Sequence, residues 1–205
     1  MIPGSKHAQG RVIDASGLPS YGFSHRSLMW WGTFGMIAIE GTVFALACVV
    51  YFYVRTRVNE WPPSALPPEL TWGTANTLLM LASCIPNHWT KRAAEAEDLP
   101  KVRIGIWICV AFGVGFIVLR ALEFTALNVR WDTNAYGSAV WMLLSLHTIH
   151  VVTDFWDTTV LAVLMRSDKI EGKRYVDVSE NGLYWYFVVI AWLPIYAIIY
   201  FGARV

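Results

Sequence analysis

Residues 28–54 read LMWWGTFGMIAIEGTVFALACVVYFYV, and Glu40 is the only formally charged residue in this stretch. A membrane-spanning helix needs about 20 consecutive, mostly apolar residues, because the hydrocarbon layer is about 30 Å thick. The stretch is long enough for one span, and Arg55 and Arg57 follow it with charges that favour the membrane surface. We therefore expect a first membrane helix over about residues 28–54.

The composition of the whole chain supports the same environment. The 205 residues are 56% hydrophobic and 15% charged, with a mean hydropathy of +0.43. Soluble domains carry about 25% charged residues, so this chain has too little charge to cover a water-facing surface. A disordered chain, a nucleic-acid binder and an ordinary soluble enzyme are excluded on this ground, and the net charge of +1 points to no strongly charged partner. A polytopic membrane protein remains.

Four further apolar stretches follow the first. They cover about residues 70–89, 102–127, 136–165 and 182–201. The second stretch contains Asn76 and Pro86, so its far end is expected to fray or kink. The predicted fold class is all-α, a polytopic bundle of five transmembrane helices in one membrane domain, 28–205, after an extramembrane tail, 1–27.

The distribution of positive charge predicts the orientation of this bundle. The tail and the loops on its side of the membrane hold 11 of the 16 Lys and Arg residues, whereas the opposite side holds 4. Loops rich in Lys and Arg stay in the cytoplasm. We therefore expect the N-terminus to be cytoplasmic and the C-terminus to lie outside.

One face of the fourth stretch carries ionisable residues. His147, His150, Asp154 and Asp157 follow one another at steps of three, four and three, which places them on one helix face. Lipid cannot solvate this face, so it is expected to point into the bundle or toward a partner. Two interpretations stay open, a proton relay and a polar seam in which His150 pairs with Asp154. A metal site is disfavoured, because the chain offers one His-x-x-His pair and no second pair on another helix.

Three more charged residues stand out deep within the predicted spans. Arg120 and Glu123 have the spacing of a helical ion pair, although each can also pair with another helix. Glu40 is alone at the middle of the first span, with no base near it in the sequence. A lone carboxyl group there is expected to be protonated or paired across helices. Glu40, Glu123 and Arg120 are therefore candidates for proton uptake or for an interface.

Small residues in two spans are candidates for close helix contacts. Gly32 and Gly35 lie in the first span, and Gly113 and Gly115 lie in the third. Small residues let helix backbones approach closely in membranes. We expect these glycines to mark packing surfaces.

Five landmarks, in order along the chain, resemble subunit III of the haem-copper cytochrome c oxidases in its short five-helix bacterial form. The most specific is Tyr136-Gly137-Ser138, followed after eight residues by His147-Thr148-Ile149-His150-Val151. The others are Ile39-Glu40, Ala75-Asn76-Thr77 with Ser83-Cys84, Arg120-Ala121-Leu122-Glu123-Phe124, and Tyr184-Trp185-Tyr186-Phe187-Val188-Val189-Ile190-Ala191-Trp192. The resemblance covers about residues 28–205.

The chain departs from this family pattern at several polar positions. Arg120 stands where the family has Gln, Tyr186 where it has His, and Val189 where it has Asp. Asp154 and Asp157 lie outside the usual pattern. These changes indicate a divergent branch in which the polar contacts between the helices have been rearranged.

The resemblance implies a non-catalytic integral subunit of a respiratory terminal oxidase, a complex that reduces dioxygen to water and pumps protons. It implies that this chain binds no metal or other cofactor, and that haem and copper belong to partner subunits. Subunit I would be the main contact, with subunit II and possible further subunits beside it, and structural phospholipids would bind between the helices. The expected role is to support stability, lipid binding and proton uptake of subunit I in the bacterial inner membrane.

Two alternatives to this function stay open. Related five-helix proteins accompany nitric oxide reductases, so the chain is also compatible with an accessory subunit of that branch. The ionisable face of the fourth span is compatible with an independent proton-coupled transporter.

Overall fold

The structure, a computed structural model, describes residues 21–63, 67–167 and 170–204. The main helices are α1 (Leu28–Arg55), α2 (Leu70–Glu95), α3 (Leu99–Thr125), α4 (Ala135–Leu164) and α5 (Gly172–Tyr196). A short 3-10 turn, η1 (Ser24–Arg26), precedes α1, and a π-helical turn, η2 (Ala197–Phe201), continues α5. The described residues contain no strand, which confirms the predicted all-α class.

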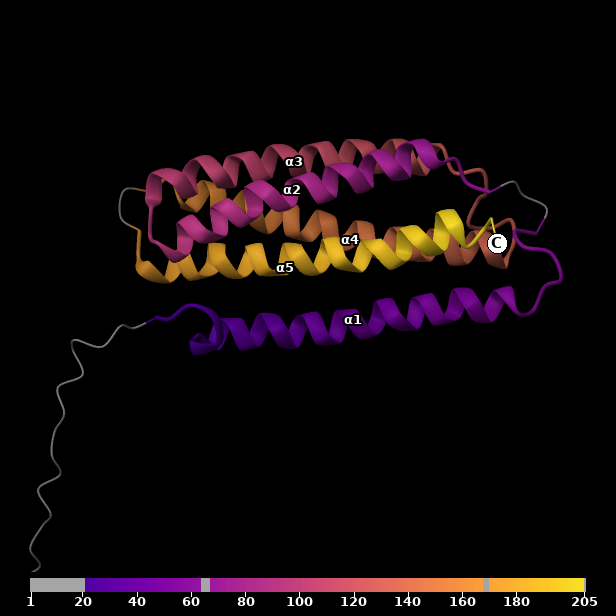
Figure 1. Cartoon of the computed structure of the whole chain (residues 1–205), viewed down its shortest axis with the longest axis horizontal. Helices are drawn as coiled ribbons and strands as arrows, with labels where there is room; N and C mark the ends of the chain where they lie inside the picture. Colours follow the sequence, from indigo (N-terminus) through magenta and orange to yellow (C-terminus); the bar gives the residue numbers. More distant parts are fainter. Residues whose placement is uncertain (1–20, 64–66, 168–169, 205) are drawn as a thin grey trace, which may run out of the picture.

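Four of the five helices are long and apolar enough to cross a membrane: α1, α3, α4 and α5 together with η2. The exception is α2, whose sequence carries more polar residues. Figure 1 shows the five helices side by side along one axis, with α1 at one edge of the bundle. The greater part of the predicted tail, residues 1–20, lies outside the described residues.

Side-chain caps fix where three of the helices begin. Ser27 accepts a hydrogen bond from the amide of Met29 at 3.1 Å before α1, and Asn134 accepts one from the amide of Gly137 at 2.8 Å before α4. Asp98 accepts from the amide of Lys101 at 3.3 Å before α3. These caps satisfy amide groups that have no partner inside the helix.

Two predicted helix ends are wrong. The second stretch was expected to end at about residue 89 with a frayed or kinked far end, but α2 continues to Glu95 with Pro86 inside it. Thr90 supports this turn by donating to the Pro86 carbonyl at 2.8 Å. The fifth helix was expected to begin at about Gly182, but α5 begins at Gly172, because its first turns bury polar groups such as Ser179 against the bundle.

The helices α2 to α5 form a packed unit, and α1 lies against one side of it. The helix α2 contacts α3 and α5, while α4 contacts α3, α5 and α1. The core runs along α4 and α5, where Trp192, Tyr136 and Leu143 are almost completely buried. In α1, by contrast, only Phe44, Ala47 and Tyr51 are buried. Most of the surface of α1 therefore faces away from the described chain.

The glycines of α3 lie in close helix contacts, whereas Gly32 and Gly35 of α1 do not in the described part of the chain. A Cβ atom at Gly113 would collide with the ring of Phe155, and one at Gly115 would come within 3.1 Å of Leu79, so both mark close contacts as expected. A Cβ atom at Gly32 or Gly35 would meet nothing within 4 Å in the described part of the chain. These two glycines therefore mark no packing surface within the chain.

Candidate functional site

Buried polar side chains between α2, α3, α4 and η2 form what we call the sealed cluster. Its members are Asn76, Arg120, Glu123, His147 and Tyr200. The expected pair is present, because Arg120 Nη1 lies 2.8 Å from Glu123 Oε2, and both side chains are almost fully buried. Tyr200 donates to Glu123 Oε1 at 2.5 Å, and Asn76 donates to Oε2 at 3.3 Å. The carboxylate is thus hydrogen-bonded on both oxygens.

The ring of Trp192 closes one side of the sealed cluster. The centre of the Arg120 guanidinium lies 4.1 Å from the ring centroid of Trp192. A cation above an indole face is attracted by the ring quadrupole, and the attraction grows when water is excluded. Trp192 in turn donates its N–H to Thr77 at 2.7 Å. The positive charge of Arg120 therefore has a carboxylate partner and an aromatic partner.

The hydrogen bonds of His147 fix its protonation state. Its Nε2 atom lies 3.0 Å from the Val188 carbonyl, which can only accept, so Nε2 carries the proton. Its Nδ1 atom lies 3.2 Å from Arg120 Nη2, which can only donate, so Nδ1 presents its lone pair. His147 is therefore held as the neutral Nε2–H tautomer. Both ring nitrogens of His147 are engaged in hydrogen bonds.

A second set of polar contacts, centred on Glu40, joins α1 to α4 and α5. Tyr184 donates to Glu40 Oε2 at 2.7 Å, and His150 Nε2 lies 3.7 Å from the same oxygen. Glu40 is thus paired across helices, as expected for a carboxyl group alone in its span. His150 does not pair with Asp154 as predicted, because it points toward α1.

The contact between Glu40 and His150 is an ion pair only when the imidazole carries a proton on both nitrogens. The Nδ1 atom of His150 lies 2.7 Å from the Leu146 carbonyl, so Nδ1 carries a hydrogen. In neutral imidazole, Nε2 would then turn a lone pair toward the Glu40 carboxyl group. At 3.7 Å the contact is longer than a hydrogen bond, so the hydrogen bond that fixes the Glu40 carboxyl group is the one from Tyr184.

Asp154 and Asp157 both turn toward Asn181 of α5. The Asn181 amide donates to Asp154 Oδ1 at 3.4 Å and to Asp157 Oδ2 at 3.2 Å. Asp154 is only 5% exposed, whereas Asp157 is exposed. The structure therefore splits the ionisable face of α4, since His147 belongs to the sealed cluster and the other three residues face α1 and α5.

Asn181, Tyr184 and Glu180 of α5 were not identified as site residues from the sequence. Asn181 and Tyr184 lie one turn apart, and Glu180 stands beside them, so a helical spacing of polar groups was present. Asn181 preceded the expected start of the fifth span, and Tyr184 was noted only as part of a landmark. A predicted fifth helix that began at Gly172 would have included both Asn181 and Tyr184, and would have made them candidates for contact with the acidic residues of α4.

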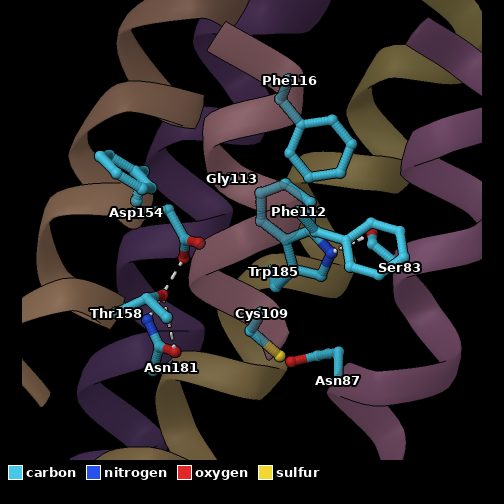
Figure 2. A pocket seen from close by; sticks show the side chains of 11 residues that line it. Ser83, Asn87, Cys109, Phe112, Gly113, Phe116, Asp154, Thr158, Asn181 and Trp185 are labelled. Atoms are coloured by element: carbon cyan, nitrogen blue, oxygen red, sulfur yellow. Dashed lines mark hydrogen bonds between the residues drawn. The ribbon is translucent and has the colours of Figure 1, made fainter. Parts of the chain in front are cut away.

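Two hollows border these groups. An open groove of about 700 Å³ lies between α1, α4 and α5, and we call it the acidic groove. Its polar lining consists of Thr33, Glu40, Thr153, Asp154, Asp157, Lys173, Arg174, Asp177, Glu180, Asn181 and Tyr184. A smaller cavity of about 30 Å³ lies deeper, and its lining is drawn in Figure 2. Asp154 and Asn181 line both hollows.

The described residues hold no group of three or more His, Cys, Asp or Glu side chains that could bind a metal ion. The acidic residues of the groove are spread over α1, α4 and α5 rather than converging on one point. Their arrangement suits exchange of protons or contact with a partner.

Comparison with known proteins assigns the family. The sequence profile described as cytochrome c oxidase subunit III matches residues 55–204, which is most of the chain. The chain belongs to the cytochrome c oxidase subunit III family. The match includes the sealed cluster and the landmark around His147, whereas Glu40 precedes it.

Individual relatives are similar to this chain over most of their own length and most of its length. Cytochrome c oxidase subunit 3 of Thermostichus vulcanus is 24% identical over 206 residues, covering 99% of this chain and 100% of the relative. The protein of the same name from Alkalihalophilus pseudofirmus is 26% identical over 200 residues, covering 93% and 96%. That from Synechocystis sp. is 25% identical over 180 residues, covering 86% and 76%.

As a subunit III, the chain is part of an oxidoreductase complex and is not itself catalytic. Its helices make it a multi-pass membrane protein. The sealed cluster is then the polar core of a non-redox subunit, and the acidic groove is the part of it in which protonatable groups remain accessible.

Proposed function

We propose that this chain is the subunit III of a bacterial haem-copper terminal oxidase and that it packs beside subunit I. Haem and copper would reside in subunits I and II, where dioxygen is reduced to water and protons are pumped. The observation that carries this proposal is the family match over residues 55–204. The whole complex would lie in the inner membrane, with the N-terminus of this chain in the cytoplasm.

The helix α1 supports a lateral contact with partner subunits. Large apolar side chains of α1 are exposed along its length, including Trp31, Phe34, Ile39 and Leu46. Such a surface is covered by lipid tails or by the helices of a partner. We assign one side of α1 to subunit I and the remaining apolar surface to structural phospholipids.

Purification of the complex tests this assignment. The tagged chain is isolated in a mild detergent, its partners are identified by mass spectrometry, and a reduced-minus-oxidised haem spectrum is recorded. We expect subunits I and II of a haem-copper oxidase, with turnover of dioxygen. Co-purification with a nitric oxide reductase, or isolation of the chain alone with substrate-dependent proton flux in proteoliposomes, would overturn the proposal.

Glu40 is the candidate for supporting proton uptake, because its carboxyl group lies 3.7 Å from His150 Nε2 and borders the acidic groove. In the intact complex, Glu40→Gln keeps an oxygen for the Tyr184 hydroxyl but removes the acid. We expect a change in steady-state turnover or in the rate of inactivation during turnover, measured across pH. Thr42→Val, also on α1 but bonded only to its own helix, is the matched control. Rates and inactivation kinetics that do not change in Glu40→Gln would reject this role.

A further inference from the structure

Another open groove, which we call the basic groove, lies where α2 meets α5 and the turn before α1. Its volume is about 620 Å³. Figure 1 shows α2 beside α5 and away from α1. The basic groove and the acidic groove share none of their described lining residues, so they are separate sites. The lining of the basic groove consists of Phe23, Ser24, His88, Lys91, Arg92, Glu95 and Tyr186.

The Lys91 ammonium group is already satisfied within the chain. Its Nζ atom lies 2.7 Å from Ser179 Oγ, 3.2 Å from the Ser179 carbonyl oxygen and 3.1 Å from Glu95 Oε1. An ammonium group has three protons, so these three contacts use all of them. The Ser179 hydroxyl in turn donates to Glu95 Oε1 at 3.4 Å. The charges of Lys91 and Glu95 therefore cancel, and the pair adds no net charge to the groove.

Arg92 supplies the positive charge that is not neutralised. Among the described residues, its guanidinium group forms no salt bridge and no hydrogen bond, so its N–H donors remain available. A guanidinium group is always charged in proteins and presents its donors in a fork that matches a phosphate or carboxylate group. The basic groove therefore carries a net positive charge and is suited to bind an anion.

The pair formed by His88 and Tyr186 keeps a donor of its own. His88 Nδ1 lies 3.1 Å from the Tyr186 hydroxyl oxygen. If the hydroxyl donates, Nδ1 accepts and the proton of the neutral ring lies on Nε2. If Nδ1 donates, the hydroxyl proton of Tyr186 is unused. In either case one donor of the pair is left for a ligand, and Ser24 brings a further hydroxyl group to the same groove.

A stripe of exposed apolar side chains on α2 leads to these donors. Its residues follow one another at steps of three and four, which places them on one helix face: Leu78, Leu81, Ile85, His88 and Arg92. Leu78 is 62% exposed, Leu81 45% and Ile85 76%, and the two polar residues are exposed as well. The helix ends one turn after Arg92. The stripe is therefore apolar along the inner part of α2 and polar near its end.

This order of apolar and polar side chains matches a phospholipid in one leaflet. With a rise of 1.5 Å per residue, Leu78 and Ile85 are about 10 Å apart along the helix, within the half-thickness of about 15 Å of the hydrocarbon layer. Acyl chains can cover these side chains while a phosphate group reaches the donors near the helix end. A small soluble anion would use the donors but leave the stripe uncovered.

We propose that the basic groove binds a phospholipid in the leaflet at the η1 end of the bundle. Its phosphate group is held by Arg92 and by the pair of His88 and Tyr186, and its acyl chains lie along the apolar stripe of α2. The inference rests on the location of the chain in a membrane and not on its assignment to an oxidase. It places a lipid on α2, whereas the phospholipids proposed above cover α1.

Photolabelling of the purified complex tests the site. The probes are phosphatidylglycerol with a photoreactive diazirine in its acyl chain and diacylglycerol with the same chain, and peptide mass spectrometry locates the label. We expect phosphatidylglycerol to label residues 78–85 at least about tenfold more strongly than diacylglycerol, because a hydrogen bond to a charged group contributes about that factor. An equal concentration of inorganic phosphate should leave the labelling unchanged.

Two arginine variants localise the recognition of the phosphate group. Arg92→Gln should lower the labelling by phosphatidylglycerol about tenfold, to the level of diacylglycerol. Arg166→Gln is the matched control, because Arg166 is an exposed arginine that follows α4 at the same end of the bundle and lies outside the groove lining. It should leave the labelling unchanged. Both arginines are exposed, so both variants are expected to assemble.

Four results would overturn the proposal. Equal labelling by diacylglycerol would show that no phosphate group is recognised, and an effect of Arg166→Gln as large as that of Arg92→Gln would show that only the overall charge matters. Loss of the label to inorganic phosphate would indicate a site for a free anion. Residues 78–85 that stay unlabelled would show that a partner covers the stripe. The subunits that co-purify are identified separately, so failure of the oxidase assignment is distinguishable from failure of the lipid site.

Discussion

The sealed cluster and the acidic groove use the same kinds of side chain with opposite consequences. In the sealed cluster, Arg120 neutralises Glu123, and the carboxylate accepts hydrogen bonds from two further helices. In the groove, Asp154 and Asp157 share one amide and have no cation in salt-bridge contact among the described residues. Carboxyl groups inside this membrane protein are thus paired with a cation in the sealed cluster and left without one, in the described part of the chain, at the Asp154–Asp157 pair.

The largest effect is expected where the sealed cluster is opened. Glu123→Leu leaves the buried Arg120 without its carboxylate, and an unpaired buried charge costs about 3–5 kcal/mol. We expect a large fall in the temperature at which the chain dissociates from the complex, measured by size-exclusion chromatography after heating. The double variant Arg120→Met with Glu123→Leu removes both charges and should recover most of the loss. A double variant as unstable as the single one would show that pairing is not what matters.

A smaller effect is expected from packing, which also differs between the two regions. Gly113→Ala in α3 forces the ring of Phe155 to move, and overpacking of this kind costs about 1–3 kcal/mol. Gly32→Ala in α1 is the matched control, because its Cβ atom meets nothing within 4 Å in the described chain. The same dissociation temperature is measured for both variants. A loss as large for Gly32→Ala as for Gly113→Ala would place a partner helix against that face of α1.

The smallest effect is expected at a partly exposed charge outside both regions. Asp98 precedes α3, and its hydrogen bonds with Lys101 lower the pKa of the carboxyl group. Because the pKa is lower in the folded state, the stabilisation is complete above the unfolded value and is lost as pH falls through the folded value. Asp98→Asn should therefore flatten the pH dependence of thermal stability slightly in the acidic range. An unchanged pH dependence would show that this contact contributes nothing measurable.

The sequence predicted the helices better than it predicted their ends. Long apolar runs identify spans, because hydropathy reports residence in lipid. The first turns of α5 escaped this test, because Ser179 and Glu180 are polar and yet buried against other helices. The same reasoning explains α2, which continues past Pro86 through a polar segment that packs on α3 and α5.

The candidate site was predicted only in part. The Arg120–Glu123 pair follows from spacing, since both residues lie on one helix. The His150–Asp154 pair was wrong, because His150 is drawn toward Glu40 on α1, a contact between distant parts of the sequence. His147 and His150 lie about 60° apart around α4, given 3.6 residues per turn. That angle was enough to turn one toward the sealed cluster and the other toward the groove.

The most direct test of the difference between the two regions is residue-resolved labelling of carboxyl groups in the purified complex. A hydrophobic carbodiimide reacts with protonated carboxyl groups that it can reach, and peptide mass spectrometry identifies the modified residues. We predict modification at the Asp154–Asp157 pair and none at Glu123, with modification of the pair decreasing as pH rises. Modification of Glu123, or an unmodified Asp154–Asp157 pair at low pH, would contradict the division into a sealed cluster and an open acidic groove.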